Sequence, residues 1–251
     1  MHRKWDQNIY LEDLKKAVGN VGFVMGVVVL TVILMRTVLV FAKTPGTTPV
    51  LEICSFPMAL SGFTIFSAAF PSWAYANQYY KEARNHYDYF VVSRMSWKKY
   101  GVMRIISVSI SGGLIMAIPL AIVFSYSYMI GSRELGYLFE GMKIRVVIQN
   151  LGIPMVLCIK TGLGFLFGAF WALVGFLSSF LLKNKYAPFL IPFVLSQFFW
   201  VIFQDYPMLN PNHLVRGENL DSYGLSAFLL FVYVFIAALS IFLAFLRKEN
   251  Q

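Results

Sequence analysis

The sequence predicts an all-α polytopic membrane protein with six transmembrane helices. Of its 251 residues, 58% are hydrophobic and 13% are charged, whereas an ordinary soluble domain has about 25% charged residues. The mean hydropathy is +0.65, and the apolar residues form long uncharged runs. A soluble fold of this size could not bury that much apolar surface, so the composition excludes a soluble enzyme.

Six stretches are long and apolar enough for helices that cross the hydrocarbon core of a bilayer, which takes about 20 residues. Together they make one transmembrane domain over residues 1–251, with spans at about 19–42, 56–76, 105–128, 161–182, 187–203 and 223–246. A further apolar stretch, 146–159, is too short to cross alone. It is either an interfacial or re-entrant segment or an extension of the fourth span, interrupted by Gly152 and Pro154.

Residues 3–17 precede the first span and are predicted to form an amphipathic helix that lies on the membrane surface. Its apolar residues recur at helical spacing and its charged residues take the other side. A solvated N-terminal arm is the alternative. No cleavable signal peptide is expected, because the first apolar run is long enough to remain in the membrane.

The distribution of Lys and Arg predicts the orientation. With both termini in the cytoplasm, 14 of the 21 basic residues fall in cytoplasmic segments and six in outside segments, which is the positive-inside pattern of a multi-pass protein of the cell membrane. The net charge of +9 therefore indicates topology, and no nucleic-acid partner is expected.

The segment 77–104, between the second and third spans, is expected to face the cytoplasm and is rich in aromatic and charged residues. Aromatic rings interleaved with Arg are enriched where a protein surface docks a partner. We therefore expect a partner-docking helix within 82–94. Residues 97–100 instead fit an interfacial aromatic belt with positive-inside lysines.

Residues 80–104, and the following span with its Ser, Gly and Pro residues, resemble the region between the second and third helices of ABC-2-type permease subunits. The residues that carry the resemblance are Tyr80-Lys-Glu-Ala-Arg-Asn-His-Tyr-Asp-Tyr-Phe-Val-Val-Ser-Arg-Met-Ser-Trp-Lys-Lys-Tyr100, Gly101-Val-Met-Arg104, Ser107, Ser111, Gly112, Gly113 and Pro119. In outline the resemblance extends to the N-terminal helix and the six spans. It implies an ABC-2, type V exporter-like architecture, in which this segment is a coupling loop that docks on a separate ATP-binding cassette ATPase subunit.

The resemblance also implies a coupling surface, carried over position by position. It comprises Glu82, Arg84, His86, Tyr87, Tyr89, Phe90 and Arg94. The chain departs from the family where Arg84-Asn85-His86 replaces the usual small or Gly-rich turn, so the boundary of the coupling helix stays open.

Chemistry within the chain itself is not expected. The Walker A pattern G-x-x-x-x-G-K-[ST] does not occur, so this polypeptide cannot cradle ATP phosphates. The resemblance implies that ATP and Mg are bound by the partner ATPase, and that a second copy or a related permease completes the translocation path. We expect no catalytic residue, cofactor or metal, since His213 with Asp205 and Glu218 is weak as a ligand set.

Two cations are placed within or beside apolar runs, where an ionised group is costly. Arg36 either snorkels to the outer headgroups or lines a substrate path, where it would meet an acidic group such as Glu52. Lys160, at the outer mouth of the fourth span, has the same two interpretations, with snorkelling favoured.

The leading functional hypothesis is the membrane-spanning permease subunit of an ATP-driven transporter. Small members of such families often export peptides or other amphipathic or apolar molecules, which is what the resemblance implies. The alternative is a non-ABC integral membrane protein, either an ion-coupled carrier or a scaffold. A carrier would be expected to show membrane-embedded Asp or Glu and discontinuous helices.

Overall fold

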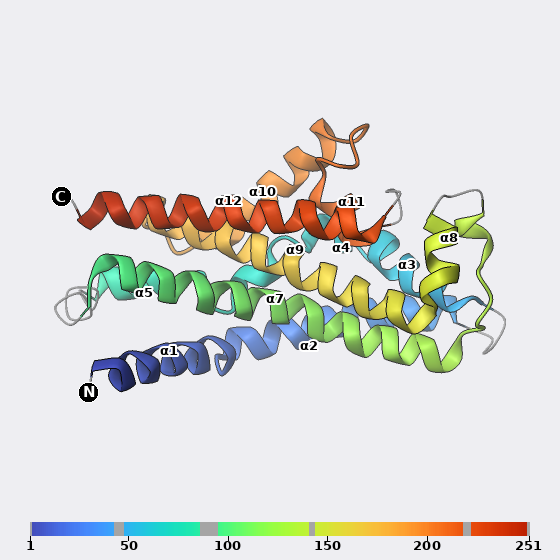
Figure 1. Cartoon of the computed structure of the whole chain (residues 1–251), viewed down its shortest axis with the longest axis horizontal. Helices are drawn as coiled ribbons and strands as arrows, with labels where there is room; N and C mark the ends of the chain where they lie inside the picture. Colours follow the sequence, from blue (N-terminus) through green and yellow to red (C-terminus); the bar gives the residue numbers. More distant parts are fainter. Residues whose placement is uncertain (1, 43–47, 86–94, 141–143, 218–221, 250–251) are drawn as a thin grey trace.

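The structure, a computed structural model, describes residues 2–42, 48–85, 95–140, 144–217 and 222–249. Within these ranges the chain forms helices and turns, with one isolated bridge between Pro49 and Ser132. The helices run along one another in an elongated bundle, and both chain ends lie at the same end of it (Figure 1). We call this the terminal end, and the opposite end the distal end.

Four helices are long and apolar enough to cross a membrane: α2 (Val21–Phe41), α7 (Trp97–Ile130), α9 (Ile153–Leu182) and α12 (Tyr223–Glu249). They confirm the predicted helices at 19–42, 105–128, 161–182 and 223–246, and they indicate a membrane protein. The start of α7 lies well before the predicted span, because the Ser96 side chain caps the helix by accepting a hydrogen bond from the Lys99 backbone N–H.

Helices α7 and α9 form the centre of the bundle. They approach closely because small residues face each other: a Cβ at Gly112 would lie 2.2 Å from that of Ala172, and one at Gly168 would lie 2.4 Å from the Gly112 carbonyl oxygen. Small residues of this kind let two helix backbones meet in a membrane. The largest fully buried side chain, Trp171, lies on α9.

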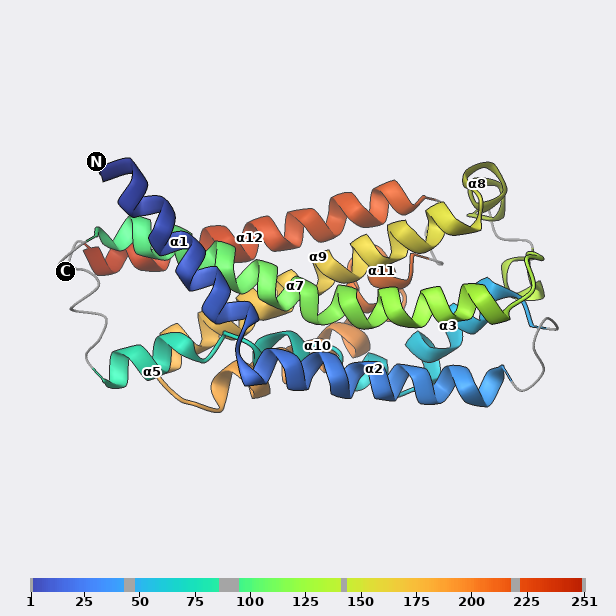
Figure 2. The same ribbon diagram turned by 90° about the horizontal axis from the view of Figure 1, so that it is seen from below.

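The second predicted span, 56–76, is not one continuous helix, so it is not confirmed as a span. The chain instead forms α3 (Val50–Leu60), α4 (Phe63–Phe66), the 3₁₀-helix η1 (Phe70–Trp73) and α5 (Gln78–Arg84). Gly62 at φ +75° separates α3 from α4, and Pro71 cannot donate a helical hydrogen bond. The broken segment still runs from the distal end to the terminal end (Figure 2).

The region after α9 also differs from expectation. Helix α10 (Ala187–Ile202) occupies the predicted fifth span but has only 16 residues, fewer than a membrane crossing takes. The chain after α10 contains a further short helix, α11 (Pro211–Arg216). Leu214 and Val215 of α11 are buried, and the helix contacts α9, α10 and α12.

Two further helices lie at opposite ends. Helix α1 (His2–Val18) confirms the predicted N-terminal helix, and it crosses α7 obliquely at the terminal end (Figure 2). Helix α8 (Ile144–Leu151) stands across the bundle axis at the distal end (Figure 1). Gly152, at φ +78°, separates α8 from α9, so the stretch 146–159 divides between a separate short helix and an extension of the fourth span.

Candidate functional site

A buried charged cluster lies at the terminal end, centred on Arg104 of α7. Arg104 is two turns into the helix, on the same face as Tyr100 and Val108, both fully buried. Because this face of α7 points into the bundle, the guanidinium is only 2% exposed. A charge buried to this extent must be paired and hydrogen-bonded.

Two carboxylates from different parts of the chain provide that pairing. One guanidinium nitrogen of Arg104 binds Asp13 Oδ1 of α1 at 2.7 Å, and the other binds both oxygens of Glu82 of α5. Asp13 and Glu82 are 6% and 7% exposed. The planar fork of an Arg side chain suits such recognition of carboxylates.

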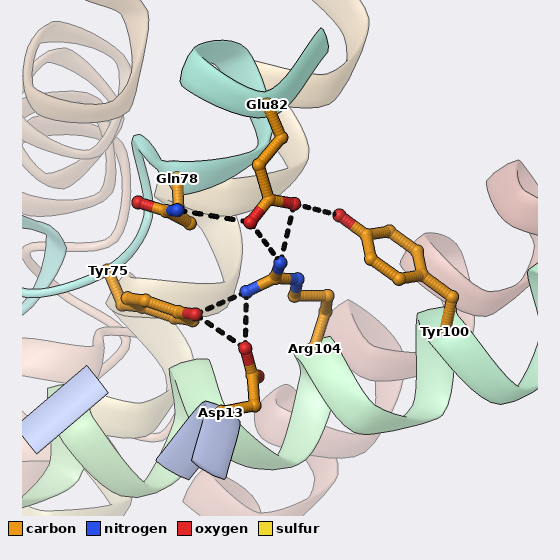
Figure 3. A network of polar contacts seen from close by, with 6 residues as sticks. All are labelled: Asp13, Tyr75, Gln78, Glu82, Tyr100 and Arg104. Carbon is orange, nitrogen blue, oxygen red and sulfur yellow. Dashed lines mark hydrogen bonds and ion pairs between the residues drawn. The ribbon is translucent and has the colours of Figure 1, made fainter. Parts of the chain in front are cut away.

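Three further side chains hold the carboxylates in place (Figure 3). Tyr75 donates to Asp13 Oδ1 at 2.5 Å, Tyr100 donates to Glu82 Oε2 at 2.5 Å, and Gln78 donates to Glu82 Oε1 at 3.0 Å. Both tyrosine rings also lie about 5 Å from the guanidinium carbon, within range of a cation–π interaction. We call these six residues the Arg104 cluster.

The cluster joins three elements that are far apart in sequence. Asp13 and Arg104 are 91 positions apart, and Glu82 and Arg104 are 22 apart. One partner is on α1, another on α5, and the cation itself is on α7. Removing one member of such a buried ion pair costs about 3–5 kcal/mol, because the other charge stays buried. The three elements are therefore expected to move as one unit.

Two atoms of the cluster have no hydrogen-bond partner within the described part of the chain, namely Asp13 Oδ2 and Arg104 Nε. Tyr75 and Arg104 both donate to Asp13 Oδ1. The two carboxylates and the guanidinium together carry a formal charge of −1 when all three are ionised. Asp13 Oδ2 is thus an acceptor of the cluster that the described residues leave without a donor.

An aromatic cluster adjoins this site and fixes the end of α12. Lys248 Nζ lies 3.9 Å from the centre of the Trp97 ring and donates to the Tyr79 hydroxyl at 2.9 Å. Phe245, one turn earlier, contacts the rings of both Trp97 and Tyr79. The sequence analysis placed Trp97 in an interfacial aromatic belt, and in the structure its ring also packs within the protein.

Another buried cation lies toward the distal end. Lys160 of α9 is fully buried, so snorkelling, the favoured interpretation, was wrong. Its contacts include the Ser55 hydroxyl of α3, which accepts a hydrogen bond from Nζ at 3.3 Å, and the Phe139 ring, centred 6.0 Å away. Phe139 belongs to the 3₁₀-helix η2 (Tyr137–Phe139), which covers the lysine.

The predicted site residues are placed as follows. Glu82 is buried in the Arg104 cluster, so it cannot lie on a docking surface as predicted, whereas Arg84 is exposed on α5. Arg36 lies on the exposed face of α2, and Glu52 lies against Gly136. The other predicted coupling residues lie outside the described residues: His86, Tyr87, Tyr89, Phe90 and Arg94.

His213 lies on α11 and stacks on the Trp200 ring of α10, with ring centres 5.2 Å apart. Arg216 follows one turn later on the same helix. Arg216 itself donates to the Met58 carbonyl oxygen of α3 at 3.1 Å. The His213 ring thus packs α11 against α10.

Sequence reasoning missed most of the Arg104 cluster. Arg104 was counted among the positive-inside residues and named in the family resemblance, but it was given no partner, and Asp13 and Tyr75 were not singled out. One signal was available: Gln78 and Glu82, like Tyr100 and Arg104, are four residues apart, which places each pair on one helix face. Nothing in the sequence could pair Asp13 with Arg104 over 91 positions.

The fold defines the class of protein as an all-helical membrane protein. Comparison with known proteins found no matching family model, no matching curated protein and no matching solved structure.

Proposed function

We propose that this chain is the membrane-spanning permease subunit of an ABC-2-type transporter, driven by a separate ATPase subunit. The observation that carries the proposal is the Arg104 cluster. It ties both flanks of residues 86–94, the segment that resembles a family coupling helix, to the bundle: Glu82 precedes that segment and Arg104 follows it. Asp13 adds the N-terminal helix to the same unit.

In this proposal the terminal end faces the cytoplasm, as the Lys and Arg distribution predicts. Residues 50–76 make the second crossing as a broken segment. Helices α10 and α11 together make the fifth crossing, as a short helix followed by a turn back into the bundle. Broken backbone is tolerated at membrane depth where protein surrounds it. Six crossings then place both termini in the cytoplasm.

The cluster suggests how a partner could drive the bundle. When a docked ATPase moves the segment 86–94, its two flanks transmit the displacement to α1 and α7 through charge-assisted hydrogen bonds. Helix α7 packs closely on α9, so the displacement reaches the centre of the bundle. A second copy or a related permease would supply the other wall of the path, and the apolar spans favour peptide, amphipathic or apolar substrates for export.

An ion-coupled carrier is a second candidate, and one observation favours it. Asp13 and Glu82 are buried carboxylates, and Asp13 Oδ2 has no hydrogen-bond partner among the described residues. Buried acidic groups and discontinuous segments such as 50–76 are features of carriers that couple transport to ions or protons.

Copurification separates the two candidates. The chain, tagged and extracted in mild detergent, should bring down an ATP-binding subunit, and the complex should hydrolyse ATP while the isolated chain should not. A Tyr87→Ala/Phe90→Ala variant should insert normally but lose the ATPase, because truncating aromatic anchors at an interface typically costs about 2 kcal/mol or more.

The matched control is Tyr137→Ala, which removes an exposed ring at the distal end and should leave copurification unchanged. Transport by the chain alone, driven by an ion gradient, would refute the ATPase-dependent function and support the carrier.

A further inference from the structure

An apolar groove opens at the terminal end between α2, η1 and α10. Its volume is about 340 Å³, and it is lined by Gly22, Trp73 and Phe189. We call it the Trp73 groove. Its floor is fixed by close backbone packing, because a Cβ at Gly22 would lie 2.3 Å from the Trp73 carbonyl oxygen. The Asn20 side chain secures the same approach by donating to the Ala74 carbonyl oxygen at 2.8 Å.

The groove lies where two apolar helices begin. Gly22 is at the start of α2 and Phe189 is at the start of α10, and the surface beyond them is apolar and exposed. Exposed apolar residues on these two helices include Val21, Val24, Val28, Leu190 and Phe198. With the proposed orientation, this position corresponds to the inner leaflet, just below its headgroups. Trp73, 37% exposed, is a residue type enriched at that level.

A pair of exposed lysines precedes each of the two long helices that line the groove. Lys15 and Lys16 end α1, shortly before Gly22, and Lys183 and Lys185 lie in the turn that leads into α10. All four are exposed. No acidic residue occurs in 14–22 or in 183–189. The wall of the groove is thus apolar, and exposed basic residues precede both α2 and α10 in the sequence.

We propose that the Trp73 groove binds an anionic phospholipid of the inner leaflet. One acyl chain lies against Trp73 and Phe189, and the headgroup phosphate binds Lys183 and Lys185, with Lys15 and Lys16 on the other rim. A phospholipid is the one ligand class that needs both features: a second copy of the chain would cover the apolar wall without needing the lysines, and free phosphate would need no groove. Anionic lipids are attracted to clustered basic residues at this level.

The inference rests on the proposed orientation but not on the ATPase, so it is tested on the full chain alone. The purified protein is reconstituted in phosphatidylcholine vesicles that contain acyl-brominated phosphatidylglycerol or acyl-brominated phosphatidylcholine. Bromine quenches tryptophan fluorescence on contact. The chain has five Trp residues, so the Trp73 signal is obtained as the difference between wild type and a Trp73→Phe variant.

We expect Trp73 to be quenched by both lipids, with brominated phosphatidylglycerol preferred by about 5-fold. The Lys183→Gln/Lys185→Gln variant should lose most of that preference and keep quenching by phosphatidylcholine. The matched control is Lys98→Gln/Arg247→Gln, which should keep the preference. It removes one basic residue of α7 beside the end of α12 and one of α12 itself, and α12 lies across the bundle from α2 (Figure 2).

Three outcomes would overturn the proposal. Equal quenching by the two lipids would mean ordinary annular contact, absence of quenching by either would mean that another chain covers the groove, and relief of quenching by inorganic phosphate would mean a free-anion site. Native mass spectrometry of the wild-type protein with both lipids provides a measurement that needs no Trp73 variant. There the lysine double variant should lose the phosphatidylglycerol adduct, whereas an unchanged adduct would count against the proposal.

Discussion

Arg104 and Lys160 are both buried cations, one toward each end of the bundle, but they are held differently. Arg104 is bound by two carboxylates, which are themselves held by two tyrosines and a glutamine. The contacts of Lys160 include a hydroxyl at 3.3 Å and an aromatic ring. An Arg fork fixes several partners at once, whereas a Lys ammonium is a compact point charge on a flexible stem.

This difference concerns how many separate elements one side chain joins at the terminal end. At the terminal end, α1, α5 and α7 are joined by charge-assisted hydrogen bonds, the strong kind. Toward the distal end, Lys160 lies under η2, a short helix of three residues. The following substitutions test this comparison, from the largest expected effect to the smallest.

Substitution of Arg104 by Met should have the largest effect. It leaves two buried carboxylates without their cation, which costs about 3–5 kcal/mol. Thermal unfolding in detergent, followed by size-exclusion of the remaining monodisperse protein, measures the loss. Arg84→Met is the control on the exposed side of α5, and it should change stability little.

The Arg104→Met variant also provides a test of cause. Adding Asp13→Asn and Glu82→Gln removes the unpaired charges, so much of the lost stability should return. If the triple variant stays as unstable as the single one, the cluster acts through packing rather than through charge.

Tyr75→Phe should have a smaller effect. It removes the hydroxyl that hydrogen-bonds Asp13, and a hydrogen bond to a charged group contributes about 1.5–3 kcal/mol. The same unfolding measurement applies. Tyr126→Phe on α7 removes a hydroxyl outside the cluster and is the matched control. Equal effects of the two changes would show that the tyrosine hydroxyl of the cluster has no special role.

Lys160→Met should destabilise the protein less than Arg104→Met. The substitution keeps the length and apolar stem of the side chain, and the contacts it loses include the hydrogen bond to Ser55. A hydrogen bond to a charged group contributes about 1.5–3 kcal/mol. Hydrogen–deuterium exchange should show faster exchange in 135–140, and no change in 75–84. A loss as large as that of Arg104→Met would remove the distinction between the two ends.

Lys98→Gln should have the smallest effect. Lys98 and Glu249 form an ion pair at 3.6 Å, with the Lys side chain 57% exposed, and such surface pairs contribute about 0–1 kcal/mol. The expected change in unfolding temperature is close to the error of the measurement. A large change would mean that the end of α12 is held by this pair rather than by Lys248 and its rings.

How much could be predicted from the sequence differs between the helices and the site. The four long helices could be predicted because each is an uncharged run of sufficient length, and their ends carry local signals such as Ser96 and Gly152. The break at Gly62 could have been found from the same kind of signal, yet the apolar run over 56–76 was given more weight. The Arg104 cluster could not be predicted, since Arg104 at the end of a span has the same local pattern whether it faces lipid headgroups or two carboxylates.

The sequence by itself determined the class of the protein, the long apolar helices and the side on which its basic residues gather, because hydropathy, helix length and charge are summed over neighbouring residues. Only the tertiary structure decided that Glu82 faces inward, that Lys160 is covered by η2, and that Asp13 meets Arg104. Those contacts depend on which helix faces meet across many tens of residues. Side-chain packing between helices decides which faces meet, and a local sequence pattern does not contain that information.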